Sequence, residues 1–234
     1  MKKAKKVIVL LIAVIMMLAL TACGTFGAAI KVHIGGIIEF GAYEQDNDTS
    51  NGKEPIEWKV LARDGSKILV ISKYALDAKP YDTENEDVTW ETCSLRTWLN
   101  GTFLNEAFSE AEQSMIQTTE VSADENPDYS TDPGNDTKDK IFLLSIDEAN
   151  KYFLWTYKRR MCVPTAYAIA NGAGTYDEYK VDGEATCWWW LRLPGCYQSD
   201  AAYVNINGSV GSRGDYVGNG RGCVRPAMWI DLDA

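Results

Sequence analysis

CWWWLR at residues 187–192 and CVRPAMWI at residues 223–230 are the two stretches that decide the fold. Both are short and apolar and lie next to Gly or Pro, which is typical of buried strands. A strand alternates its side chains between two faces, so Trp188, Trp189 and Trp190 cannot all point the same way. We expect these rings to pack in the core, with a platform for stacking sugars as the alternative.

The segment between these strands, residues 196–221, consists mainly of Gly, Asn, Ser, Tyr, Asp and Val. Such residues favour tight turns and an exposed ribbon. The apolar residues of the segment are spaced by two or four positions, which predicts a strand face that packs on the core. These inward residues are Ala202, Val204, Ile206 and Val210, and the outward ones between them are Tyr203, Asn205 and Asn207.

The rest of the chain shows short strand and helix patterns in mixed order. Strands are predicted at 37–40, 58–61, 67–71 and 140–145. Helices are predicted at 94–99 with Ser94 as cap, at 105–117, at 145–155 behind a Ser145–Glu148 capping box, and at 164–170 behind Pro164. Residues 122–139 lack periodicity and predict a surface excursion. We therefore expect one α+β domain with short, twisted antiparallel strands and two or three helices, whose last strands pair with early ones.

Residues 45–52, with the sequence QDNDTSNG, form a polar turn between the first two predicted strands. Its acids are typical of calcium loops, but the ligand spacing and the closing Glu of an EF-hand are missing. We therefore expect a solvated loop, and the sequence predicts no metal site.

Composition excludes several classes of protein. The chain has 234 residues, a net charge of −10, and is 46% hydrophobic and 11% aromatic, which excludes a disordered, collagenous or multi-pass membrane protein. The acidic charge argues against a nucleic-acid partner, because phosphate binding depends on basic patches. His33 is the only histidine, so no mechanism that needs two imidazoles is possible.

The amino terminus predicts export. Lysines in the first six residues precede an apolar run at 7–20, which is too short to span a bilayer but fits a signal peptide. The run ends in Leu20-Thr21-Ala22-Cys23, which resembles the bacterial lipobox. This resemblance implies a lipoprotein signal peptide at 1–22, lipidation of Cys23, a tether at 23–30, and a membrane-anchored protein on the cell surface. An ordinary secretory signal with a chance cysteine is the alternative.

The five remaining cysteines then meet an oxidising or redox-neutral space. Five is odd, so at least one stays free, and no spacing suggests a metal site. We expect Cys93, Cys162 and Cys187 to be buried as small apolar residues. Cys196 and Cys223 flank the glycine-rich segment, and a bridge between them is left open.

Six short motifs resemble a bacterial family of exported domains of unassigned function. They are FGAYEQ at 40–45, PIEW at 55–58, LRTWLN at 95–100, FLLS at 142–145, WWWLR at 188–192 and VRPA at 224–227. The carboxy-terminal part resembles the C-type-lectin-like fold of formylglycine-generating-enzyme-type domains. This resemblance implies such a fold for residues 31–234.

The ending of the chain is also similar to that of the variable target proteins of diversity-generating retroelements. In those systems, replacement of template adenines in AAY codons cannot produce Lys, Glu, Gln, Met or Trp. Residues 196–221 contain no Lys, Glu, Met or Trp, and Gln198 is the one departure, which would have to be fixed by the template. The resemblance therefore implies a variable binding region at about 196–221.

The residues themselves indicate a binding surface in the same segment. Tyrosines supply rigid contact area and small polar residues supply adaptable hydrogen bonds, as in antibody loops. The expected ligand-binding residues are Tyr197, Ser199, Asp200, Tyr203, Asn205, Asn207, Ser209, Ser212, Arg213, Asp215, Tyr216, Asn219 and Arg221. Trp188, Trp190, Arg192 and Arg225 are expected to support this surface from below. A glycine-rich hairpin whose tyrosines only shield the core is the alternative.

Three functions are compatible with this pattern. The sequence favours a surface lipoprotein that binds a protein through a diversified face, without a cofactor. A carbohydrate-binding lectin or adhesin is the alternative, although the EPN or QPD calcium triplets of lectins are absent. A formylglycine-generating-type enzyme is disfavoured, because neither Cys93 nor the carboxylates Glu91 and Asp147 lie in a catalytic motif. We therefore expect no catalytic residues.

Overall fold

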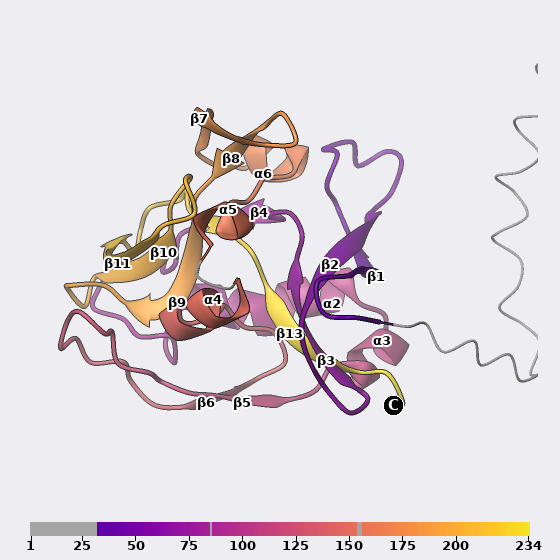
Figure 1. Ribbon diagram of the computed structural model, residues 1–234, viewed down its shortest axis with the longest axis horizontal. Helices are drawn as coiled ribbons and strands as arrows, with labels where there is room; N and C mark the ends of the chain where they lie inside the picture. The colour runs from indigo at the N-terminus through magenta and orange to yellow at the C-terminus, as the bar shows by residue number, and fades with distance from the viewer. Residues whose placement is uncertain (1–31, 85, 154–155) are drawn as a thin grey trace, which may run out of the picture. The chain divides into compact units, whose positions relative to one another are not determined.

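The structure of the protein is a computed structural model that describes residues 32–84, 86–153 and 156–234. The predicted signal peptide, Cys23 and the whole of the predicted tether lie outside the described residues. In the part that is described, no helix is long and apolar enough to cross a membrane. The described residues mix strands with short helices, which confirms the α+β class (Figure 1).

The first sheet joins the beginning of the domain to its end. Its antiparallel order is β1 (Ile37–Tyr43), β2 (Glu54–Asp64), β3 (Lys67–Ser72) and β13 (Ala227–Asp231). Residues 68–72 of β3 are all buried, as their apolar run predicts. The pairing of Ala227 with Ile71 confirms that the last strand returns to an early one.

The second sheet carries the glycine-rich ribbon. Its order is β11 (Val210–Tyr216), β10 (Asp200–Val204), β9 (Trp189–Pro194), β12 (Cys223–Val224) and β4 (Asp77–Ala78) (Figure 1). Every residue of β9 is buried. The rings of Trp188 and Trp190 meet at 4.8 Å, whereas Trp189 contacts Phe153 at 6.5 Å, so the tryptophans divide between two faces as expected.

The helices are shorter and more numerous than the sequence predicts. They are α1 (Ser94–Trp98), the π-helical turn η1 (Leu99–Phe103), α2 (Leu104–Ala107), α3 (Glu110–Met115), α4 (Ile146–Tyr152), α5 (Tyr157–Arg160) and α6 (Ala166–Ala170). The predicted capping box of Ser145 and Glu148 opens α4. The cap predicted at Ser94 is wrong, because Cys93 caps α1. The helix predicted to open at Pro164 begins two residues later, with Thr165 as its cap.

The single helix predicted at 105–117 is also wrong. Phe108 is extended, with φ of −132°, and it separates α2 from α3. Ser109 then opens α3 through a second capping box with Glu112. Apolar periodicity continues across this break, so it gives no sign that the helix stops.

Two small ladders complete the domain. β5 (Thr119–Val121) pairs with β6 (Thr137–Asp139), and β7 (Thr175–Val181) pairs with β8 (Glu184–Cys187). The strand predicted at 140–145 is reduced to a single bridge between Phe142 and Ala227. The cause is Asn100, whose side-chain oxygen accepts the N–H groups of Lys140 and Ile141 and so keeps them out of a ladder.

Candidate binding face and its scaffold

The ribbon formed by β10 and β11 has one side that packs on the core and one side that faces solvent. Asp200 pairs with Tyr216 at its base and Val204 pairs with Val210 near its turn. Ala202 and Val204 are fully buried, as their spacing predicts, and Ile206 and Val210 are half-buried against the core. The apolar half of the ribbon therefore belongs to the core, and its polar half is available at the surface.

None of the thirteen expected ligand-binding residues is buried. Tyr197 and Tyr216 are 63% and 45% exposed, and Arg213 and Arg221 are exposed. The others are half-buried: Ser199, Asp200, Tyr203, Asn205, Asn207, Ser209, Ser212, Asp215 and Asn219. The structure thus brings all of these residues onto one ribbon and its flanks.

Several polar residues of the set shape the turns of the ribbon. The Asn207 side-chain oxygen accepts from both the N–H and the hydroxyl of Ser209, at 2.9 and 2.7 Å. Asn205 accepts from the N–H of Ile206, and Asn219 from that of Arg221. Such local bonds satisfy turn backbone that would otherwise need water. These asparagines therefore have a structural task, which the sequence alone did not distinguish from ligand contact.

Tyr203 also differs from the other tyrosines. Its ring meets that of Trp188 at 5.5 Å in an edge-on contact and covers Gly211. Burial, together with the charge of Asp215, raises the pKa of its hydroxyl. Tyr203 thus joins the ribbon to the tryptophan layer, whereas Tyr197 and Tyr216 project from it.

Arg192 fixes the end of β9. It is 3% exposed, and its guanidinium donates to the carbonyls of Ser122 and Leu143 at 3.2 and 3.1 Å. It also pairs with Glu148, and with Asp124 at 3.2 Å. A buried guanidinium needs this many partners to offset its lost hydration.

Arg225 has the corresponding position beside β12. It donates to the Ser72 carbonyl at 2.9 Å, and its guanidinium lies over the rings of Trp189 and Phe153 at 5.1 and 5.3 Å. Like Arg192, Arg225 is buried, and its guanidinium contacts aromatic rings and backbone carbonyls. The two arginines hold the strands that precede and follow the ribbon in the sequence, β9 and β12.

Sequence reasoning missed two segments that support the ribbon. Within residues 122–136, Asn126 is buried and donates to the carbonyls of Pro194 and Ser212, at 2.7 and 2.8 Å. Arg160, at the end of α5, donates to the carbonyl of Gly208 at 2.7 Å. Their partners are backbone carbonyls, which leave no mark in the sequence.

A groove lies beside the ribbon. The N–H of Asp82 donates to the Val217 carbonyl at 3.0 Å and that of Val88 to the Gln198 carbonyl at 3.2 Å, so residues 82–84 and 86–88 lie along the ribbon. They border a cavity of about 550 Å³ that α1 and η1 also line. Its lining includes Asp82, Glu84, Glu86, Asp87 and Trp98, together with threonine hydroxyls. The backbone bonds to Gln198 and Val217 place this groove along one flank of the ribbon.

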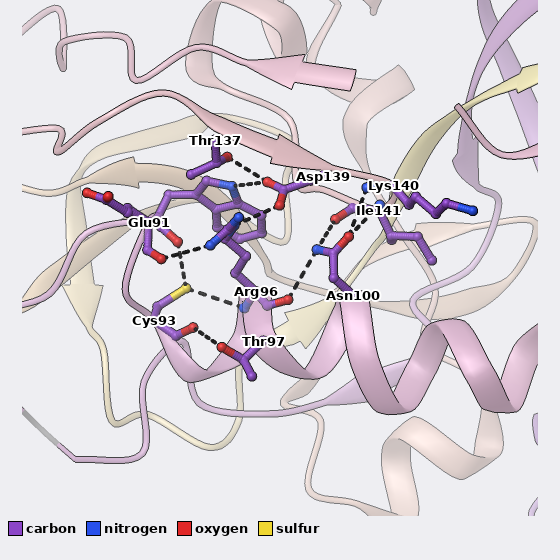
Figure 2. A network of polar contacts seen from close by, with 10 residues as sticks. Glu91, Cys93, Arg96, Thr97, Asn100, Thr137, Asp139, Lys140 and Ile141 are labelled. Carbon is purple, nitrogen blue, oxygen red and sulfur yellow. Dashed lines mark hydrogen bonds and ion pairs between the residues drawn. The ribbon is translucent and has the colours of Figure 1, made fainter. Parts of the chain in front are cut away.

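The neighbourhood of Cys93 and Glu91 is a structural clamp (Figure 2). The Arg96 guanidinium donates to the fully buried Asp139 carboxylate at 2.7 Å and to the Glu91 carbonyl at 2.9 Å. Trp90 and Thr137 donate to the other oxygen of Asp139, at 2.9 and 2.6 Å. This arrangement ties α1 to β6.

Cys93 belongs to this clamp. Burial raises the pKa of its thiol to about 12, so it stays protonated at neutral pH. Its sulfur accepts the N–H of Arg96 and caps α1. Asp147, the other carboxylate considered, is exposed in the first turn of α4.

Three carboxylates converge where the 45–52 turn begins and ends. Oxygens of Glu44, Asp46 and Glu54 lie within 4.8 Å of one another. Glu44 and Asp46 each accept the N–H of Asp48, and Glu54 accepts that of Gln45. These bonds order the turn, and residues 46–52 of the predicted solvated loop are exposed, whereas Gln45 is half-buried.

The fold and this face together define a small α+β domain that presents a polar, tyrosine-bearing ribbon on a buried tryptophan scaffold. Over residues 65–232 the chain matches the model of a family described as "Domain of unknown function (DUF6273)". The match covers more than half of the chain, so the protein belongs to this family. No curated protein and no solved structure matches it.

Proposed function

We propose that the protein is a lipid-anchored surface receptor that binds a protein partner through the ribbon and the adjoining groove. The domain would be a variant of the C-type-lectin-like fold, with Cys23 carrying the lipid. The observation that carries the proposal is the division of the ribbon. Its alanines and valines complete the core, while Tyr197, Arg213 and Tyr216 project from a backbone held on three sides.

Because of this division, the residues that stabilise the fold differ from those that would contact a partner. Substitution of an exposed side chain away from caps and strained positions changes stability by about 0.5 kcal/mol or less. The projecting residues are therefore free to change without loss of the fold, as a diversified face requires. Asn126 and Arg160 support the ribbon through the backbone carbonyls of Ser212 and Gly208, and every residue type provides such a carbonyl.

Charge favours a basic partner. Four acidic residues line the groove on the flank of the ribbon, and the chain as a whole has a net charge of −10. Opposite charge across an interface speeds association and is screened by salt. A lysine- or arginine-bearing segment of a protein would fit both the groove and the tyrosines.

A displayed library of random peptides provides a direct test. The wild-type chain should select peptides enriched in Lys and Arg, with affinity that falls as salt rises. The double variant Tyr197→Ala/Tyr216→Ala should bind the selected peptides at least about tenfold more weakly, because exposed tyrosines are common interface anchors. Its melting temperature should stay nearly unchanged.

Tyr179→Ala is the matched control, because Tyr179 is 41% exposed but lies on β7. Equal binding by the double variant and by this control would overturn the ribbon as the binding site. A glycan array tests the alternative function in parallel. Selective binding of glycans without binding of peptides would indicate a carbohydrate-binding lectin.

Two further observations test the anchoring and the diversification. Cys23→Ala should abolish labelling of the protein by a fatty-acid analogue, and unchanged labelling would refute the lipid anchor. In the surrounding DNA, diversification requires a near-copy of the codons for residues about 188–228 beside a reverse-transcriptase gene, with differences only at adenines. A gene without that copy would favour an ordinary adhesive module.

A further inference from the structure

Three buried cysteines meet beneath the tryptophan scaffold. Cys162, in the segment between α5 and α6, forms an antiparallel bridge with Cys187 at the end of β8. The N–H of Cys187 donates to the Cys162 carbonyl at 2.9 Å, and the N–H of Cys223 donates to Trp188, the next residue along, at 3.2 Å. All three side chains are 0–1% exposed. All are free thiols here, as are Cys93 and Cys196 among the described residues.

The bridge places the backbones of Cys162 and Cys187 at a separation that a disulfide can span. Residues that lie directly opposite in an antiparallel pair and share a backbone hydrogen bond have Cα atoms about 5.5 Å apart. This separation is also the most common one in disulfides. In the reduced protein the Cys162 thiol donates to the carbonyls of Lys73 and Val163, at 3.8 and 3.6 Å. Joining it to Cys187 therefore requires the thiols to turn toward each other.

The folded protein protects these thiols from reaction. Burial raises the pKa of both Cys162 and Cys187 well above the ordinary value, and only a thiolate attacks a disulfide efficiently. Access is equally restricted, since neither side chain reaches solvent. A bond between them has to form while the chain folds, before the segment at 161–163 closes over β8.

We propose that Cys162 and Cys187 form a disulfide when the chain folds in the presence of a small-molecule disulfide such as oxidised glutathione. One cysteine thiolate attacks a glutathione sulfur and releases the first glutathione thiolate. The second cysteine attacks the resulting mixed disulfide and releases the other. The two cysteines lose two protons and two electrons in total, and one oxidised glutathione becomes two reduced ones. The proposal does not depend on ligand binding.

The bond would clamp the ribbon scaffold from behind. It would close the loop that contains α6 and β7, and β8 leads directly into the buried strand β9. Cross-linking a loop of this length stabilises mainly by restricting the unfolded chain. We expect a rise in melting temperature of about 5–10 °C over the reduced protein.

Peptide mapping tests the proposal on the full chain. The denatured protein is refolded in a buffer of oxidised and reduced glutathione. It is then unfolded again in denaturant with an excess of alkylating agent, so that every free thiol reacts, and digested with trypsin. Cys162, Cys187 and Cys223 fall in separate tryptic peptides, 161–180, 181–192 and 222–234, because Arg225 precedes a proline and is not cut. The expected product links 161–180 to 181–192 and lacks two hydrogen atoms relative to the separate peptides.

Variants make the pairing specific. Cys162→Ser and Cys187→Ser should each remove the linked pair and the rise in melting temperature, whereas Cys223→Ser and Cys196→Ser should keep both. Folded, reduced protein exposed to the same buffer should remain unlinked for far longer than refolding protein. Complete alkylation of all three cysteines after refolding would overturn the proposal, and so would a link between 181–192 and 222–234 that persists in Cys162→Ser.

Discussion

Gly208 shows how the smallest residue of the ribbon limits what the ribbon can vary. Its φ is +81°, and a Cβ atom at this position would lie 1.8 Å from the backbone oxygen of Tyr157. An L side chain there meets both an unfavourable backbone conformation and immovable neighbouring backbone. A diversified ribbon therefore has to keep this glycine while its tyrosines change.

Gly208→Ala should lower the free energy of unfolding by about 3 kcal/mol, because strain and a backbone clash add together. Gly52→Ala is the matched control, since Gly52 has φ of +98° but open space around it. It should cost about 1 kcal/mol. Urea denaturation measures both, and equal losses would show that the packing against Tyr157 is unimportant.

The charged form of Asp200, at the base of the ribbon, lowers the stability of the folded protein. Partial burial raises the pKa of its carboxyl, as does Asp215, against the lowering effects of Cys196 and Arg213. A raised pKa in the folded state means that ionisation disfavours folding, so the protein gains stability as pH falls through that pKa. Asp200→Asn should therefore stabilise the protein at pH 7, by about 0.5 kcal/mol or less for a group this exposed.

The gain from Asp200→Asn should disappear below the pKa of the unfolded chain, where aspartate is protonated in both states. Thermal melts of wild type and variant at pH 7 and near pH 3 measure the difference. Asp128→Asn, at an exposed position, is the control. A variant that is less stable than wild type at pH 7 would contradict the sign.

At the scale of elements, the clamp of Arg96 and Asp139 holds a helix to a strand distant in sequence. Asp139→Asn leaves the guanidinium without its buried counter-charge. We expect a loss of about 3 kcal/mol in the free energy of unfolding. The exposed control Asp128→Asn should cause almost no loss. Chemical denaturation measures both, and a loss below about 1 kcal/mol would show that Arg96 finds another partner.

The elements also show how far sequence reasoning reaches. The buried strands around Trp189 and Ile71 were predicted because apolar runs report burial directly, and the α4 cap because its bonds are local. The break at Phe108 and the lost strand at 140–145 were not, since Asn100 acts on Lys140 across the fold. The composition of residues 196–221 likewise predicted exposed tyrosines. The packing of Tyr203 and the role of Asn126 could not be predicted, because both depend on tertiary contacts.

At the scale of the whole molecule, stability should decrease from β9 toward the ribbon's edge. β9 is buried and pairs on both sides, whereas β11 is an edge strand of half-buried and exposed residues. Amide hydrogens at the edge exchange through local opening, and central ones through global unfolding. Hydrogen exchange should therefore be slowest in Trp189–Leu193 and clearly faster in β11. Equal rates would indicate that the ribbon opens only when the domain unfolds.

The parallel pairing of β12 with β9 has one more consequence. Cys223 lies beside Trp189, the first residue of β9, so the chain that leaves this strand at Pro194 has to return along its whole length before β12 begins. Whatever length of chain connects those points, the distance it has to bridge stays the same. A tight turn could therefore not replace the ribbon, because it would not reach the position at which β12 pairs with β9.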